Sequence, residues 1–171
     1  MTKSRHNKKV MIALLILFFV APSPFFANAV DDKISHKAQN LSTTEIINAS
    51  NAARKELGLQ PLFFSSKLTE LAKQKTTDMQ TMHYFDHYSP TGKSLKNFLN
   101  DINYKYIYAG ENLAKNYSDD NELVQAWLNS PTHRHNMLHP DFNEVGVAFD
   151  YVSLNGINQL VAVMIFGKED I

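Results

Sequence analysis

An uninterrupted apolar run near the end of the chain limits the folds that it can adopt. Residues 159–166 read QLVAVMIF, and only the first of them is polar. A strand with one solvated face alternates apolar and polar residues, so a run of this kind is typical of a strand that is covered on both faces. The preceding stretch, Val145 to Tyr151, does alternate, and Asn155-Gly156 between the two runs is a common hairpin turn. We therefore expect a C-terminal β-hairpin whose second strand lies between two layers.

The first half of the chain has the residue spacing of helices. Ser42 and Glu45 fit a capping box, and apolar residues then follow at helical spacing until Gly58 stops the helix. A second helix is expected over residues 66–82, with the aliphatic stem of Lys75 on its apolar stripe. Further helices are expected at 94–102, from Asp119-Asp120 onward, and at 132–138.

A further β-strand is expected between these later helices. Residues 104–114 alternate and are rich in β-forming side chains, and we expect the strand to end near Gly110. Helices therefore come first and strands later, with a helix between strands, which predicts an α+β layered domain. We expect this domain to occupy residues 42–167, after a short polar linker at 30–41 and before a C-terminal tail at 168–171.

Residues 1–29 have the features of a cleavable signal peptide. A basic head precedes an apolar run of about twelve residues from Val10 to Ala21, which is too short to span a bilayer comfortably. A small-x-small cleavage pattern follows at residues 27–29. An uncleaved anchor is the alternative, although Pro22 and Pro24 would end its helix early. We expect an exported protein that begins at Val30 and has no stable membrane span after cleavage.

Charge and cysteine content exclude some functions of the exported chain. The whole sequence has 17 basic and 17 acidic residues. The first 29 residues contain four basic residues and no acidic ones, so the remainder has 13 against 17, a net charge of −4. This balance gives no broad electrostatic reason to bind nucleic acid. The chain has no cysteine, which rules out disulfides, a thiolate nucleophile and acyl anchoring at the leader.

Histidines are concentrated in one part of the sequence. Five of the seven fall between positions 83 and 139, together with Glu111, and histidine and glutamate are the ligands that zinc accepts where no thiolate is present. Any one of these histidines could instead be packed and hydrogen-bonded in the fold. His83 and His87 have i, i+4 spacing, but no glutamate follows His83 as in a zinc-protease helix, and Pro90 comes soon after. The five histidines are His83, His87, His133, His135 and His139.

Three separated motifs resemble those of one known family. They are YFDHYSPTGKS at 84–94, YAGENLA at 108–114 and AWLNSPTHRHNMLHPDFNEVGVAF at 126–149. Together with GLQPL at 58–62 they occur in the family's order and cover most of residues 42–167. The chain thus resembles the CAP superfamily of cysteine-rich secretory, antigen 5 and pathogenesis-related proteins, in its bacterial SCP-like branch.

The resemblance implies both a fold and a site. The fold would be a three-layer α-β-α sandwich with a central antiparallel sheet and an open cleft. The metal-ligating positions of the family fall on His87, Glu111 and His133, and zinc is the divalent metal that best suits them. Longer eukaryotic members have a second glutamate at the position of Ser130 in this chain, so we expect a triad and not a tetrad.

The remaining motif residues are expected to support this site. We expect Asn112 to orient the Glu111 carboxylate or to cap the loop, and Gly110 to let the backbone pass closely. His135 and His139 are expected at the surface, Trp127 in the core. The other supporting residues are Tyr84, Phe85 and Tyr88 as cleft walls, Ser89 in a turn, and Arg134 and Asn136 in loop-pinning hydrogen bonds. Asn103 stands where the family often has glycine, and asparagine also tolerates a left-handed backbone.

The resemblance leaves three functional hypotheses open. The first is an exported, non-enzymatic binding module whose cleft takes a metal together with a lipid, a peptide or an envelope component. The second is a metal-dependent hydrolase, in which zinc-bound water attacks and Glu111 or Ser130 assists. Glu111 cannot be both a metal ligand and a free base, which favours binding, and we assign no catalytic residue. The third is a metal-independent interaction protein with a polar His/Glu network. The ligand and the oligomeric state are not given by the sequence.

Overall fold

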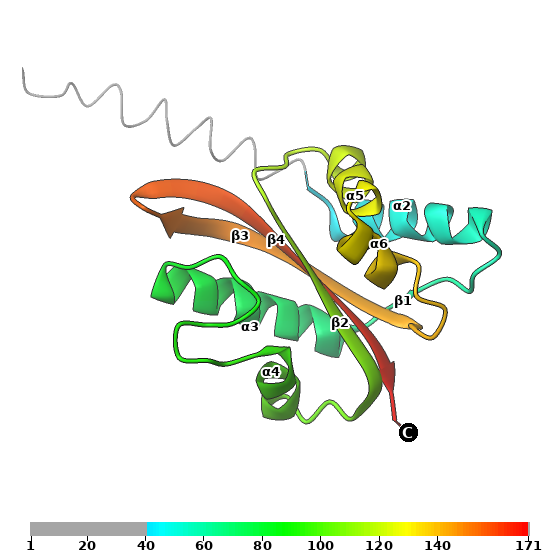
Figure 1. The fold of residues 1–171 in the computed structure, drawn as a ribbon, viewed down its shortest axis with the longest axis horizontal. Coiled ribbons are helices and arrows are strands. Elements are labelled where there is room, and N and C mark those ends of the chain that lie inside the picture. The colour runs from blue at the N-terminus through cyan, green and yellow to red at the C-terminus, as the bar shows by residue number, and fades with distance from the viewer. Residues whose placement is uncertain (1–40, 171) are drawn as a thin grey trace, which may run out of the picture.

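A computed structural model describes residues 41–170 of the protein (Figure 1). The signal peptide expected at 1–29 and the linker expected at 30–41, apart from Leu41, lie outside the described residues. Within residues 41–170 there are five helices and four strands. They are α2 (Thr43–Glu56), β1 (Phe63–Phe64), α3 (Ser66–Met82), α4 (Leu95–Asp101), β2 (Tyr106–Lys115), α5 (Asp120–Asn129), α6 (Pro131–Met137), β3 (Glu144–Leu154) and β4 (Ile157–Glu169).

The four strands form one mixed sheet in the order β1-β3-β4-β2. Strand β4 pairs antiparallel with both β3 and β2. The short β1 pairs parallel with β3, through Phe63 opposite Glu144 and Phe64 opposite Val145. The expected central antiparallel sheet is therefore confirmed for β2, β3 and β4. The parallel pairing of β1 makes the four-stranded sheet a mixed one. Its two residues are too short to produce a recognisable period in the sequence.

Helices cover both faces of this sheet, as Figure 1 shows, with α2, α5 and α6 on one face and α3 and α4 on the other. Residues 160–166 of β4 are all buried, and their side chains alternate between the two cores. Leu160, Ala162, Met164 and Phe166 belong to the core under α2, α5 and α6, and Val161, Val163 and Ile165 to the core over α3 and α4. The α+β, three-layer architecture and the doubly covered strand are confirmed.

Helix ends follow the signals in the sequence. The Ser42 hydroxyl accepts a hydrogen bond from the Glu45 amide at 3.4 Å at the start of α2, and Gly58 has a φ of +69° just beyond its end. Asn103, with a φ of +53°, does adopt the left-handed conformation after α4. None of the helices within residues 41–170 is long and apolar enough to cross a membrane.

Strand β2 does not end at Gly110, and that expectation was wrong. The strand continues to Lys115, and Gly110 itself pairs with Phe166 of β4. A Cβ at Gly110 would lie 3.0 Å from the ring of Phe142 and 3.1 Å from Oδ1 of Asn136. Glycine is therefore explained by close packing against the segment after β2, and not by a break in the strand.

Helix α3 lies directly on the backbone of β3 at Gly146. A Cβ at this position would be 2.1 Å from the amide nitrogen of Thr69 and 2.2 Å from the carbonyl carbon of Leu68. Both atoms belong to the helix backbone, so no side-chain rotation can make room. The separation between α3 and the sheet is fixed by the absence of a side chain at Gly146.

Candidate functional site

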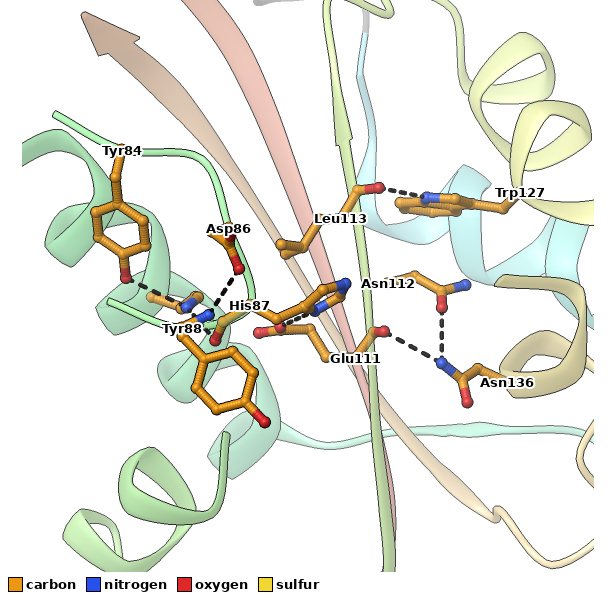
Figure 2. A network of polar contacts seen from close by, with 10 residues as sticks. Tyr84, Asp86, His87, Tyr88, Glu111, Asn112, Leu113, Trp127 and Asn136 are labelled. Carbon is orange, nitrogen blue, oxygen red and sulfur yellow. Dashed lines mark hydrogen bonds and ion pairs between the residues drawn. The ribbon is translucent and has the colours of Figure 1, made fainter. Parts of the chain in front are cut away.

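The fold brings the first two sequence motifs together as a histidine–glutamate pair. His87 lies in the loop after α3, and Glu111 lies on β2 (Figure 2). Nδ1 of His87 and Oε1 of Glu111 are 2.6 Å apart, within hydrogen-bond distance. The Glu111 side chain is only 4% exposed, whereas that of His87 is 53% exposed. A buried carboxylate therefore holds an imidazole that solvent can reach.

Glu111 has one carboxylate oxygen without a partner. Oε2 is buried and accepts no hydrogen bond from any of the described residues. A buried polar atom in this state costs free energy, because it has lost water and gained nothing in exchange. The remaining acceptor capacity of Glu111 thus suits a cation or a hydrogen-bond donor that enters beside His87.

A buried lysine on α3 holds the His87 loop by hydrogen bonds. Lys75 of α3 is fully buried, and its Nζ donates to the carbonyl oxygen of His87 at 2.9 Å and to the hydroxyl of Tyr84 at 3.2 Å. Burial lowers the pKa of Lys75, an effect that the negative charge of Glu111 opposes. The sequence predicted only that the aliphatic stem would lie on the stripe. The whole side chain is inside, because two acceptors on the loop receive its ammonium group.

The loop itself is a compact turn. The Ser89 hydroxyl lies 2.8 Å from Oγ1 of Thr91 and accepts from the Lys93 amide at 3.0 Å, and Gly92 has a φ of +82°. Burial and a hydrogen bond to Asp78 raise the pKa of the Tyr84 phenol. Tyr84 packs with Phe85 against the core over α3 and α4, so these two rings support the loop and do not line its outer surface.

A cavity of about 370 Å³ opens beside the pair. His87, Glu111 and the exposed ring of Tyr88 lie on its wall, and α4 contributes Leu95 and Leu99. Of the three aromatic residues expected to wall the cleft, only Tyr88 is in this lining. The cavity combines charged or titratable groups, His87, Glu111 and Lys96 among them, with apolar surface, which is the composition of many small-ligand sites.

Two asparagines connect β2 to α6, as Figure 2 shows. Nδ2 of Asn136 donates to Oδ1 of Asn112 at 2.9 Å and to the backbone oxygen of Glu111 at 3.1 Å. Nδ2 of Asn112 donates to the backbone oxygen of His133 at 3.1 Å. One expected role of Asn112 was to orient the Glu111 carboxylate, but its side chain bonds His133 and Asn136 instead. It positions the helix that carries His133.

His133 is half-buried on α6, near the pair but not bonded to it. Burial lowers the pKa of His133, and the charge of His87 lowers it further, so the two imidazoles are within electrostatic reach. Within residues 41–170, no three His, Asp or Glu side chains are arranged as a ready-made metal site. Ser130 precedes the first residue of α6, and the exposed Arg134 makes one long hydrogen bond, 3.4 Å, to Leu128.

The other histidines lie outside this pair. His139 is half-buried, with its ring 4.8 Å from that of Phe142 and 5.2 Å from that of the exposed His135. Of the two histidines expected at the surface, His135 is exposed and His139 is not fully exposed. His83 ends α3 with a φ of +55°, so it shares no helix face with His87. Trp127 is buried in the core, as expected, and its Nε1 donates to the backbone oxygen of Leu113 at 3.2 Å.

Sequence reasoning missed a buried arginine behind α6. Arg54 of α2 is fully buried and uses its guanidinium to donate to four backbone carbonyls. The acceptors are Gln60 at 2.9 Å, Met137 at 2.9 Å, His139 at 3.0 Å and Phe142 at 3.1 Å. Nothing local in the sequence marks Arg54, because three of these acceptors are more than 80 residues away.

The pH dependence of His87 follows from its bond to Glu111. That hydrogen bond raises the pKa of His87 above its usual 6.5. Its protonation therefore adds stability below the unfolded pKa, and this stability is lost as the pH rises through the raised folded value. We expect an NMR titration of metal-free protein to place the His87 midpoint above 6.5. Glu111→Gln should lower that midpoint, and an unchanged midpoint would contradict the pairing.

Comparison with known proteins gives a consistent picture. The profile of the cysteine-rich secretory protein family, CAP, matches residues 47–166. YkwD of Bacillus subtilis is 39% identical over 105 residues, which are 61% of this chain and 41% of YkwD. The membrane protein YlbC of the same organism is 36% identical over 122 residues, 71% of this chain and 35% of YlbC. The chain thus spans only about two fifths or less of these curated relatives.

A solved structure supports the same relationship. It is a crystal structure of an extracellular protein containing an SCP domain from Bacillus anthracis, with a TM-score of 0.64 and 29% sequence identity. The similarity covers 74% of this chain and 40% of that protein. The three-layer arrangement of residues 41–170 is therefore shared with a known SCP domain.

Proposed function

The chain belongs to the cysteine-rich secretory protein family, CAP, and from this premise we propose that it acts outside the cytoplasm as a non-enzymatic binding module. The cleft beside His87 and Glu111 binds a divalent metal, with zinc as the best match, and a lipid, peptide or envelope component. The extracellular location is supported by the description of the related Bacillus anthracis protein.

The observation that carries this proposal is the unpartnered Oε2 of Glu111. It is a buried acceptor within the residue that already holds His87, and one imidazole with one carboxylate is a donor set that zinc accepts. His133, held near by Asn112, is the third proposed ligand. A bound zinc ion would supply a positive charge that attracts an acyl, phosphate or carbonyl oxygen. Tyr88, Leu95 and Leu99 would contact the apolar part of the same ligand.

Hydrolysis requires more than these residues offer. Glu111 would lose its role as a base if it bound the metal. The hydroxyl of Ser89, the nearest serine in sequence to His87, already bonds Thr91 and the Lys93 amide. We therefore place ligand binding before hydrolysis, and before a metal-independent interaction protein, in which Oε2 would simply bond water.

Titration of zinc into the purified protein by calorimetry tests the proposal. We expect one site near one equivalent in the wild type and none in a His87→Ala/His133→Ala variant, because two of three ligands are gone. Glu111→Gln should weaken binding at least about tenfold, because even the loss of a residue that only supports a metal ligand costs roughly 10- to 100-fold in affinity. Circular dichroism would show that each variant remains folded.

The matched control is a His135→Ala/His139→Ala variant, which removes two histidines of the same helical region outside the pair. This variant should bind zinc as the wild type does. Absence of binding in the wild type would refute the metal site and leave the third hypothesis. Equal losses in both double variants would reveal adventitious binding. Turnover of peptide or ester substrates that requires His87 and zinc would establish the hydrolase instead.

A further inference from the structure

The outer edge of β3 is paired over only part of its length. β1 covers Glu144 and Val145, and Ser65 then turns the chain into α3, where its carbonyl accepts from the amide of Thr69. From Gly146 onward, β3 has no further strand on that side in the described part of the chain. Unpaired strand edges present a row of amides and carbonyls that another strand can use.

The alternation of a β-strand identifies which groups face this edge. The carbonyls of Asn143 and Val145 point toward β1, where they accept from Phe63 and Ser65. The backbone groups of Val147 and Phe149 must therefore point the same way, and those of Ala148 toward β4. Farther along, Tyr151 donates to Oδ1 of Asp150, and Nδ1 of His83 lies 3.2 Å from the Ser153 carbonyl.

The edge is thus open, in the sense of unpaired, over three residues, 147–149, of which Val147 is 1% and Ala148 6% exposed. The amides of Val147 and Phe149 and the carbonyl of Phe149 face this edge, and no hydrogen-bond partner for them is found there among the described residues. Among the described residues, the Val147 carbonyl accepts one long hydrogen bond, of 3.5 Å, from the Thr43 hydroxyl.

This open edge lies at the bottom of a groove. The groove has a volume of about 520 Å³ and is bounded by α2 on one side and α3 on the other. Ile47, Phe64, Val147 and Phe149 give it an apolar lining, with Thr69 and Lys73 on the α3 side. It is formed on different elements from the cavity beside His87 and Glu111, which lies at α4 and β2.

We propose that this groove binds an extended peptide segment of a protein partner, which adds to β3 as a strand in continuation of β1. A second copy of the chain cannot pair by the same edge, because its β3 is recessed between its own α2 and α3. Only a slender, extended chain reaches the bottom of the groove. At about 3.3 Å per residue, the open stretch accommodates roughly three to four peptide residues.

The charge of the groove selects the peptide further. Among the residues that line it in the described part of the chain, Lys73 alone is charged, and it forms no ion pair there. An acidic side chain on the peptide would meet this ammonium group at the rim. The ligand class is therefore a short apolar, β-branched or aromatic segment with one aspartate or glutamate.

Hydrogen exchange of single amides, followed by NMR, tests the geometry first. In the protein alone, the Val147 and Phe149 amides should exchange faster than that of Ala148, although all three lie within one strand. If all three exchange equally slowly, the edge is already covered and the proposal fails. If deletion of residues 30–40 then makes Val147 and Phe149 fast, the occupant is this chain's own segment and not a partner.

Selection of random heptapeptides displayed on phage tests the ligand. We expect enriched peptides to contain an acidic residue and to slow exchange at Val147 and Phe149 but not at Ala148. Asn48→Trp, which fills the groove from an exposed position on α2, should weaken binding at least about tenfold. Lys73→Glu should weaken it about fivefold, as expected for a rim charge, whereas Lys55→Glu on α2 outside the groove should leave it unchanged.

Three results would overturn the proposal. One is a selection in which no peptide is enriched more on the wild-type protein than on the Asn48→Trp protein. Another is enriched peptides that bind Asn48→Trp and wild type equally. The last is protection of amides elsewhere, for example around His87, which would place peptide binding in the other cavity.

Discussion

Arg54→Met is expected to lower the free energy of unfolding by about 3–5 kcal/mol, because each buried carbonyl left without a hydrogen-bond donor costs about 1–3 kcal/mol and neighbouring groups relax in part. Methionine fills much of the volume but donates no hydrogen bond. The carbonyls of Gln60, Met137, His139 and Phe142 would then remain buried without the guanidinium. Because a domain of this size is typically stable by only about 5–15 kcal/mol, urea denaturation followed by circular dichroism should show a large shift in midpoint.

Arg134→Met provides the matched control for this change. Arg134 is exposed and makes one hydrogen bond of 3.4 Å, so its replacement should cost less than about 1 kcal/mol. Equal losses for Arg54 and Arg134 would contradict the role assigned to the buried guanidinium. Arg54→Lys should fall between them, because a lysine ammonium cannot reach four carbonyls in the fixed planar arrangement of a guanidinium.

Gly146→Ala is expected to destabilise the fold by more than about 3 kcal/mol, which exceeds most single substitutions. The new methyl group would overlap the backbone of α3 at Leu68 and Thr69. Helix α3 would have to move away from the sheet, with loss of contacts throughout the core on that face. Thermal unfolding and the near-ultraviolet circular dichroism signal of the packed aromatic residues measure this effect.

Gly156→Ala is the control for a glycine that has a different role. Gly156 lies in the hairpin turn with a φ of +77° and nothing within 4 Å of an added Cβ. Its replacement should cost only about 1 kcal/mol of backbone strain. A Gly146→Ala protein that is as stable as Gly156→Ala would show that α3 does not rest on β3 as closely as described.

The strands of the C-terminal hairpin could be predicted because their patterns are local. An unbroken apolar run can be covered on both faces only inside a layered fold, and Asn155-Gly156 marks the turn within two residues. The end of β2 was misplaced at Gly110 because the sequence does not distinguish a glycine that ends a strand from one that packs closely against an aromatic ring. The ring is that of Phe142, which is distant in sequence.

The site was only partly accessible to the same reasoning. The juxtaposition of His87 and Glu111 came from the resemblance to a family, since no local pattern connects a loop after α3 to the middle of β2. Lys75 was placed correctly on the buried stripe, but its acceptors lie on a loop whose path the helix pattern does not contain. The metal at His87, Glu111 and His133 stays a prediction.

The position of β4 has a consequence for the order of folding. This strand pairs with both β2 and β3, yet it follows both of them along the chain. During synthesis, three of the four strands emerge before the one that joins β2 to the others. The sheet therefore closes late and through contacts distant in sequence, as between Gly110 and Phe166, which predicts slow folding. Until it pairs with both neighbours, the VAVMIF segment, which contains no charge and no proline, is prone to aggregation.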